Sequence, residues 1–169
     1  MLASLSTSAS YGFNVRRAHR AFDRLLNAFL SGHGLKTGYW YYLRVLWTND
    51  GLTQKDLSTR NNVSENTTAI LIRGMLKERL VTRRRNSRDK REWNVWLTPR
   101  AVRLRPELLP YAAHVNEIAA KGISKSELAI CRSVLKRMSA NLEQAFQTAA
   151  SSPIPGPESD EGSSAPHRA

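Results

Sequence analysis

Two polar clusters in the middle of the chain have side chains suited to contact with a nucleic acid. The first consists of Ser64, Asn66, Thr67 and Arg73, which face outward on a predicted helix. Asparagine and arginine can bond base edges through paired hydrogen bonds, whereas serine and threonine can bond either a base or a phosphate. Small polar side chains followed one to two turns later by arginine therefore predict base contacts in the major groove of DNA.

The second cluster is a run of cations that leads into a polar turn. It comprises Arg83, Arg84 and Arg85 and the turn residues Asn86, Ser87, Arg88, Asp89, Lys90 and Arg91. A β-hairpin of this kind cannot bury its tip, but the tip can lie along a phosphate backbone or enter a narrow minor groove. We predict that Arg88, Lys90 and Arg91 make such contacts. The alternative is an ordinary solvated face, which the position of the run directly after a helix-turn-helix pattern disfavours.

Local signals predict the two helices that carry the first cluster. Thr53 and Asp56 have the spacing of a capping box, so a short helix should begin near Thr53. After a polar turn, Ser64 can cap a second helix. The apolar positions of this second helix that should face a core are Leu71, Ile72, Met75 and Leu76.

Two strands are predicted after these helices, over residues 80–85 and 92–98. In the second strand, Trp93, Val95 and Leu97 alternate with Asn94 and Trp96, so the first set should face the core. Helix, turn, helix and basic hairpin together predict a DNA-binding region within residues 37–98.

This region resembles the winged helix-turn-helix of the MarR family of bacterial transcriptional regulators. The segments that carry the resemblance are Gly51–Gln54, Val63–Met75, Leu80–Val81, Asp89–Arg91 and Val95–Thr98. The Asp-x-Arg of the wing, spaced before the closing Leu-Thr, is the most specific of them, and the resemblance extends from about Val15 to Phe146. It implies a mainly α fold with a small β-wing, in which N- and C-terminal helices form a dimer.

The resemblance assigns a role to one wing residue and exposes one departure. It implies that Asp89 helps to hold Arg91 in place through a charge-assisted hydrogen bond; the alternative is an ordinary turn-forming aspartate. Arg79 stands where the family usually has a glycine that ends the recognition helix. If the backbone at Arg79 is still left-handed, the side chain adds a modest strain, and a different helix end would alter the angle of the wing.

Composition shifts divide the rest of the chain. We assign residues 11–36 and 99–149 to dimerisation helices, residues 1–10 to a flexible N-terminus and residues 150–169 to a disordered tail rich in Pro, Gly, Ser and acids. Two such copies related by a two-fold axis would place their recognition helices in successive major grooves. The expected partners are therefore a second copy of the chain and an inverted-repeat DNA operator.

The predicted dimerisation helices carry apolar stripes. Those of the first helix are Ala18, Phe22, Leu25, Leu26 and Phe29, and those of the last are Leu128, Cys131, Leu135, Met138, Leu142 and Ala145. The last set forms a heptad-like seam that begins at a capping box on Ser124. The seam can also pack within one chain. Because Cys131 lies on the seam, we expect it to have a small buried apolar role and not to act as a redox sensor. In the helix that begins at Thr98-Pro99, Pro106 and Pro110 should each bend or interrupt the helix.

Charge and composition narrow the function classes. The net charge of +12 and the pI near 10.6 favour a polyanionic partner, nucleic acid before a membrane surface. A single cysteine fits a reducing cytoplasm, and neither a signal peptide nor a long apolar stretch is evident, so we expect a cytoplasmic protein without a membrane partner. The histidines are scattered and no catalytic motif is apparent, which argues against a metal site, a cofactor and an enzyme.

The resemblance also implies a small effector, commonly a phenolic or aromatic acid, between the dimer helices and the winged domain. The candidate ligand residues are Arg16, Arg17, His19 and Arg20 in the N-terminal helix and Tyr39, Trp40, Tyr42 and Arg44 in an aromatic-rich helix predicted over residues 38–48. Arginine beside an aromatic ring can hold a carboxylate while the ring stacks on the ligand, here an aromatic acid or its thioester. The alternative is that the cations are solvated and the aromatic residues belong to the core.

Two other functions remain open at this stage. A constitutive or architectural DNA-binding protein would show low sequence specificity and no ligand effect. A small enzyme that uses the aromatic residues would show turnover of a bound compound. The effector, the operator sequence and the choice between repression and activation are not encoded in the chain.

Overall fold

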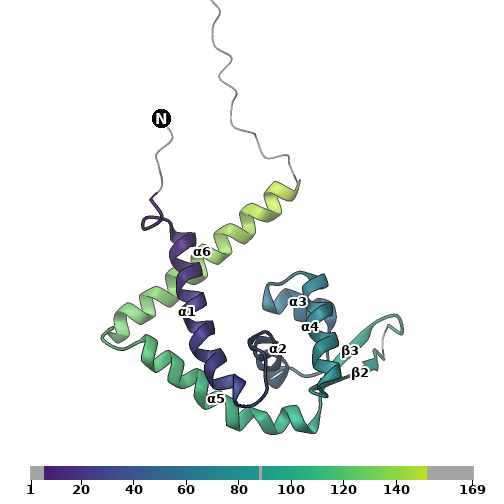
Figure 1. The fold of residues 1–169 in the computed structure, drawn as a ribbon. Coiled ribbons are helices and arrows are strands. Elements are labelled where there is room, and N and C mark those ends of the chain that lie inside the picture. Colours follow the sequence, from purple (N-terminus) through teal and green to yellow (C-terminus); the bar gives the residue numbers. More distant parts are fainter. Residues whose placement is uncertain (1–5, 88, 152–169) are drawn as a thin grey trace, which may run out of the picture. The chain divides into compact units, whose positions relative to one another are not determined.

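The computed structural model describes residues 6–87 and 89–151, and divides the chain into two units that meet between Lys121 and Gly122. The first unit contains the elements α1 (Tyr11–Ser31), α2 (Thr37–Thr48), β1 (Leu52–Thr53), α3 (Gln54–Asn61), α4 (Glu65–Lys77), β2 (Val81–Arg85), β3 (Trp93–Leu97) and α5 (Pro99–Ala119), and the second contains α6 (Lys125–Ser151) (Figure 1). The predicted fold class, mainly α with a small β-wing, is confirmed. The predictions for residues 1–5, for Arg88 and for residues 152–169 lie outside the described residues.

A three-stranded antiparallel sheet in the order β1-β3-β2 forms the wing and its base. The short strand β1, which the sequence did not predict, pairs Leu52 with Val95. The turn before β1 fits closely against β3: a Cβ atom on Gly51, where φ is +73°, would lie 2.5 Å from the Trp96 ring. The Asp50 carboxylate accepts a hydrogen bond from the Leu97 amide at 2.9 Å. These contacts fix the base of the wing to the helix-turn-helix.

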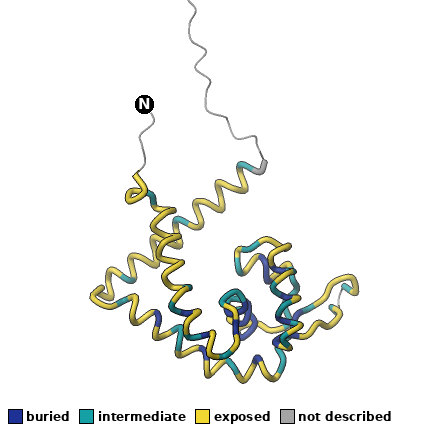
Figure 2. The backbone as a smooth tube through the Cα atoms, viewed as in Figure 1, coloured by how far each residue is buried: buried dark blue, intermediate teal, exposed yellow. Residues whose placement is uncertain are grey.

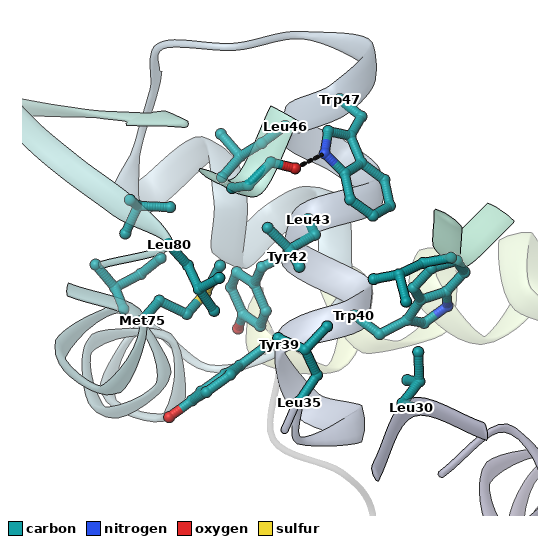
Figure 3. Packing of buried hydrophobic residues seen from close by; sticks show 14 of the residues in the cluster. Leu30, Leu35, Tyr39, Trp40, Tyr42, Leu43, Leu46, Trp47, Met75 and Leu80 are labelled. Atoms are coloured by element: carbon teal, nitrogen blue, oxygen red, sulfur yellow. Dashed lines mark hydrogen bonds between the residues drawn. The ribbon is translucent and has the colours of Figure 1, made fainter. Parts of the chain in front are cut away.

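Helix α2 lies at the centre of the core. Its buried residues are Tyr39, Trp40, Tyr42, Leu43, Leu46 and Trp47. It contacts α1, α3, α4, α5 and β3, so this aromatic-rich helix is covered on more than one side (Figures 2 and 3). Two buried polar groups of this helix are paired: the hydroxyls of Tyr42 and Thr68 lie 2.9 Å apart, and the Trp47 indole donates to the Ala101 carbonyl at 2.9 Å. The core therefore anchors both α4 and the start of α5.

Helix α4 approaches α2 closely because it has a glycine at the contact. A Cβ atom on Gly74 would meet the Tyr39 hydroxyl, and Ile72 and Met75 on the same helix are fully buried. Leu71 and Leu76 are partly buried, as the apolar pattern predicts. The buried face of α4 thus sets which of its residues point to solvent.

Two sequence predictions about the elements are wrong. Trp93 is not a core residue, because β3 extends beyond the core at that end and leaves the side chain 44% exposed. Helix α5 runs unbroken to Ala119, so the interruption expected at Pro106 or Pro110 is wrong, whereas the bend expected as the other outcome is not contradicted. A proline removes only its own amide donor, and the buried residues Leu108 and Val115 hold α5 in place on either side of the second proline.

The second unit consists of a helix with no buried side chain among its described residues up to Ala149. The predicted capping box is confirmed: the Glu127 amide donates to Ser124 Oγ at 3.2 Å and the Ser124 amide donates to Glu127 Oε2 at 2.9 Å. The Ser124 hydroxyl also donates a hydrogen bond to Glu127 Oε2, and this bond first, then the bond from the Ser124 amide, lowers the pKa of Glu127. Leu128 and Met138 of the predicted seam are half-buried, whereas the other seam residues, including Cys131, are exposed, and Leu142 is 70% exposed. The buried position expected for Cys131 is therefore not found within one chain. No helix in the described part of the chain is long and apolar enough to cross a membrane.

Candidate nucleic-acid interface

The two helices of the helix-turn-helix begin and end at well-formed caps. In the predicted capping box, the Asp56 amide donates to Thr53 Oγ1 at 3.1 Å and the Thr53 amide donates to Asp56 Oδ2 at 3.2 Å. Helix α3 ends at Asn62, which has φ 51°, and the Val63 amide then reaches the Ser58 carbonyl at 3.0 Å. Asparagine tolerates this left-handed conformation better than most residues. The turn therefore holds α3 and α4 at a defined angle.

Helix α4 separates structural side chains from exposed ones. Ser64 Oγ caps the helix by accepting a hydrogen bond from the Thr67 amide at 3.2 Å, and it also bonds the Thr67 hydroxyl at 2.9 Å. Asn66 and Arg73 are exposed, as predicted. Seven residues correspond to almost two full turns, so these two side chains share one face. Asn66 and Arg73 are thus free to point at bases, while Ser64 and Thr67 are partly engaged with each other.

The same face of α4 carries an apolar residue that the sequence analysis missed. Ile70 is 61% exposed, and it lies four residues after Asn66 and three before Arg73. Residues three and four apart are neighbours on a helix surface. An exposed apolar side chain between two hydrogen-bonding ones can contact the methyl group of thymine in the major groove. The helical spacing of Ile70 between Asn66 and Arg73 is the sequence signal that places it on this face.

The tip of the wing is held by hydrogen bonds to one carboxylate. Asp89 accepts bonds from the Arg91 amide at 2.8 Å, from its Nε at 3.3 Å and from its Nη2 at 3.4 Å. The backbone bond first, and then the side-chain bonds, lower the pKa of Asp89. The predicted bond between Asp89 and Arg91 is confirmed, and it leaves Arg91 and Lys90 exposed at the tip. Arg88, the remaining predicted cation of the tip, lies outside the described residues.

The end of α4 keeps the backbone shape of a glycine although the residue is Arg79. Its φ is 55°, in the left-handed region. The Leu80 amide bonds the Met75 carbonyl at 2.9 Å and the Arg79 amide bonds the Leu76 carbonyl at 3.0 Å, the pattern that normally ends a helix at glycine. Thr98 Oγ1 donates to the Arg79 carbonyl at 2.8 Å. The departure from the family pattern therefore adds strain without changing how the wing begins.

The sequence model of the MarR family matches residues 33–92, which cover α2 to the wing. The solved structure of transcriptional regulator PA3341 is 33% identical over 80% of this chain and 99% of that chain, with a TM-score of 0.71. The chain belongs to the MarR family. Members of this family are transcription regulators and not enzymes.

Two further comparisons place this MarR-family chain among its relatives. TtmR, an HTH-type transcriptional regulator of Methylorubrum extorquens (strain PA1), is 29% identical over 101 residues, which cover 59% of this chain and 52% of TtmR. The match thus spans about half the length of that relative. A MarR-family regulator from Listeria monocytogenes, solved with a 26mer DNA, shares the fold with a TM-score of 0.78 at 20% identity, over 87% of this chain and 98% of that chain.

The predicted ligand residues of this MarR-family chain do not form one site. Tyr39, Trp40 and Tyr42 are buried in the core, so the alternative given for them, a structural role, fits their positions. Arg44 instead lines an open cleft of about 420 Å³ together with Tyr41 and Arg60. Aromatic residues at helical spacing do not by themselves distinguish a core from a ligand site, because both need apolar faces.

The predicted cations of α1 lie together on its surface. Arg16, Arg17 and Arg20 line a hollow of about 510 Å³ with Phe13 and Arg24, which the sequence analysis did not include. His19 does not line this hollow. Its Nε2 lies 3.3 Å from the Asp23 carboxylate.

The Asp23 carboxylate also accepts a hydrogen bond from the Tyr41 hydroxyl. Burial, and then the bond to Asp23, raise the pKa of Tyr41. No group of histidine, cysteine and acidic side chains in residues 6–87 and 89–151 could hold a metal ion.

Proposed function

We propose that this chain is a dimeric, sequence-specific DNA-binding transcriptional regulator. The observation that carries the proposal is the exposed face of α4, where Asn66, Ile70 and Arg73 stand side by side on a helix whose other face is buried. Next to it, Lys90 and Arg91 project from the wing tip. This arrangement offers base readout from α4 and phosphate or minor-groove contact from the wing.

Dimerisation is supported by the apolar side chains that one chain leaves exposed. On the helices assigned to dimerisation these are Tyr11, Phe13, Val15, Phe22, Val102, Leu109, Ile118, Ile130, Val134, Leu135, Leu142 and Phe146. Helix α6 buries no described side chain by itself, and a long amphipathic helix gains most of its stability from packing. A second copy of the chain can cover most of these residues, and a dimer with two-fold symmetry is expected to bind an operator built as an inverted repeat.

The proposal is tested by measuring the affinity of the full-length protein for the DNA upstream of its own gene and for a scrambled duplex of equal length. We expect tighter binding to the upstream DNA, a dimer in sedimentation or light scattering, and a footprint on two half-sites about one helical turn apart. Equal affinity for both duplexes, without any change on adding ligand, would favour a constitutive architectural protein. A monomer at the DNA-binding concentration would contradict the proposal.

We further propose that a small aromatic acid regulates DNA binding from the hollow on α1. The guanidinium groups of Arg16, Arg17 and Arg20 can bind the carboxylate of the acid there, and Phe13 can stack on the aromatic ring of the acid. The volume of about 510 Å³ lies within the range of about 300–1,000 Å³ that small-molecule sites occupy. A ligand acts only if it binds the free and DNA-bound forms with different affinities.

The ligand proposal is tested by titrating benzoate and 2-hydroxybenzoate into the protein–DNA complex, with acetate as the control for ionic strength. We expect an aromatic acid to change the affinity for DNA and the Arg16→Gln and Arg20→Gln variants to lose this response while still binding DNA. The Arg103→Gln variant, which removes an exposed cation on α5, should respond like the wild type. An unchanged response in both α1 variants would exclude this hollow as the site.

A further inference from the structure

The outer part of the wing carries a tryptophan that the core does not use. Trp93 is 44% exposed, whereas Val95, two residues further along the same face of β3, is buried. The antiparallel register sets Arg85 opposite Trp93 and Arg83 opposite Val95. One face of the wing thus extends outward from the core as an aromatic ring flanked by two arginines.

Arg85 holds the indole ring in place. Its guanidinium carbon lies 4.9 Å from the centroid of the Trp93 ring, and its Nη1 donates a hydrogen bond to the Lys90 carbonyl. A cation over an indole face is attracted by the negative charge density of the ring. The ring is therefore presented in a defined position, linked to the wing tip, while a large part of it stays open to solvent.

Trp93 lines a groove of about 220 Å³ between the wing and α3. The other lining residues are Thr53, Gln54, Lys55, Arg83, Glu92 and Val95. Arg83 Nη2 donates a hydrogen bond to Gln54 Oε1 at 3.2 Å, which joins the two walls of the groove. The groove presents two cations, Lys55 and Arg83, against one carboxylate, Glu92, so its lining favours an anion.

We propose that this groove binds the sugar–phosphate backbone of the operator, with Trp93 packed against a deoxyribose and with Lys55 and Arg83 on the adjoining phosphate. This inference rests on the proposed DNA-binding function. A nucleic-acid backbone alternates an apolar sugar surface with a phosphate anion, and the groove places an aromatic ring beside cations. Its volume is smaller than the range of about 300–1,000 Å³ typical of enclosed small-molecule sites, which favours an extended polymer over a small ligand.

The continuity of this surface with the wing tip also favours DNA. Arg85 bridges Trp93 and the Lys90 carbonyl. A DNA strand that passes Lys90 and Arg91 would therefore lead directly into the groove. Backbone contacts fix the register of a protein on DNA without reading its sequence. Trp93 therefore contributes affinity and alignment, while α4 contributes the choice of bases.

The test compares full-length variants on an operator selected from random duplexes by the wild-type protein and on a scrambled duplex. Trp93→Ala should weaken binding to both duplexes by about tenfold, and Trp93→Phe should restore most of the loss because it keeps an aromatic face. For Lys55→Gln and for Arg83→Gln, the logarithm of the DNA-binding constant should fall less steeply with the logarithm of the salt concentration. The magnitude of the slope should decrease by about 1 in each variant. Arg103→Gln, an exposed cation of α5, should leave affinity and slope unchanged.

A hydroxyl-radical footprint separates direct contact from a structural role. The wild type should protect a sugar outside the bases read by α4, and Trp93→Ala should lose that protection alone. An unchanged footprint and affinity in Trp93→Ala would overturn the inference while leaving the proposed function in place. If Trp93→Ala fails to fold, unchanged salt slopes in Lys55→Gln and Arg83→Gln overturn it equally. A wild-type protein that binds no duplex would remove the proposed function, and the inference with it.

Discussion

Helix α4 and the wing are adjacent in the chain, but they position their exposed side chains in different ways. Helix α4 is fixed by packing: Ile72 and Met75 are fully buried, and Gly74 lets the helix approach Tyr39. The outer wing lies beyond the core, where Asp89 holds Arg91 and Arg85 holds Trp93. The base readout proposed for α4 would therefore depend on packing, whereas the backbone contact proposed for the wing would depend on short-range electrostatics. The two regions should respond differently to core mutations, to salt and to pH.

The largest effect should come from the buried side of α4. Ile72→Ala should lower the free energy of unfolding by about 2–5 kcal/mol, because it leaves a cavity in a fully packed site. Ile70→Ala on the exposed face should change stability by less than about 0.5 kcal/mol but reduce affinity for the operator. Chemical denaturation and anisotropy measure the two effects. Equal destabilisation by both substitutions would contradict the division of α4 into a packed and a reading face.

The next effect separates base readout from backbone contact. Asn66→Ala should weaken operator binding by about 1–3 kcal/mol and relax sequence preference, because it removes hydrogen bonds to a base edge. Arg91→Ala should weaken binding to all sequences and flatten the salt dependence, because it removes a phosphate or minor-groove contact. Titrations with operator and scrambled DNA at several salt concentrations measure both. If each variant lost specific and nonspecific affinity in the same proportion, the assigned roles would be wrong.

A smaller effect is expected where the two regions join. Arg79→Gly should raise the free energy of unfolding by up to about 1 kcal/mol, because glycine adopts the left-handed φ of 55° without steric cost. The gain is limited because glycine also loses more entropy on folding. Thermal denaturation of the variant measures the difference. Arg79→Ala, which keeps a Cβ atom, serves as the control and should not be stabilised.

The smallest effect should be the pH response of the wing tip. The pKa of Asp89 is lowered by its bonds to Arg91, so the charged carboxylate is favoured in the folded protein. The stabilisation is present above the unfolded pKa and is lost as the pH falls through the lower folded pKa. NMR signals of the Arg91 Nε–H should shift over this acidic window, and Asp89→Asn should remove the shift. A pH-independent signal in the wild type would mean that the bond does not hold Arg91 in solution.

The sequence predicted the local features of this fold better than the long-range ones. The caps at Thr53, Ser64 and Ser124 were recognisable because each depends on residues three positions apart. The exposure of Trp93 was not, because alternation along β3 does not reveal where the core ends. Strand β1 was missed because two residues carry no periodic signal, and its formation depends on pairing with distant Val95.

The same limit applies to the candidate sites. The outward residues of α4 follow from helical spacing and a single capping residue, so they could be predicted. The aromatic residues of α2 could not be assigned, since burial among five other elements is a property of tertiary packing. The cations of α1 were predicted as ligand residues, but the hollow beside Phe13 appears only in three dimensions.

Hydrogen bonds around Thr98 join α4, the wing and the start of α5 into one rigid unit. Thr98 Oγ1 bonds the Arg79 carbonyl at the end of α4, its amide bonds the Leu80 carbonyl at 3.0 Å where the wing begins, and Arg100 of α5 bonds the Glu78 carbonyl. One cluster of hydrogen bonds thus connects the end of α4, the last residue of the wing and the start of α5. A tilt of α5 would therefore move α4 and the wing together as one rigid unit. It would change the direction in which their exposed side chains point, but not which side chains are exposed.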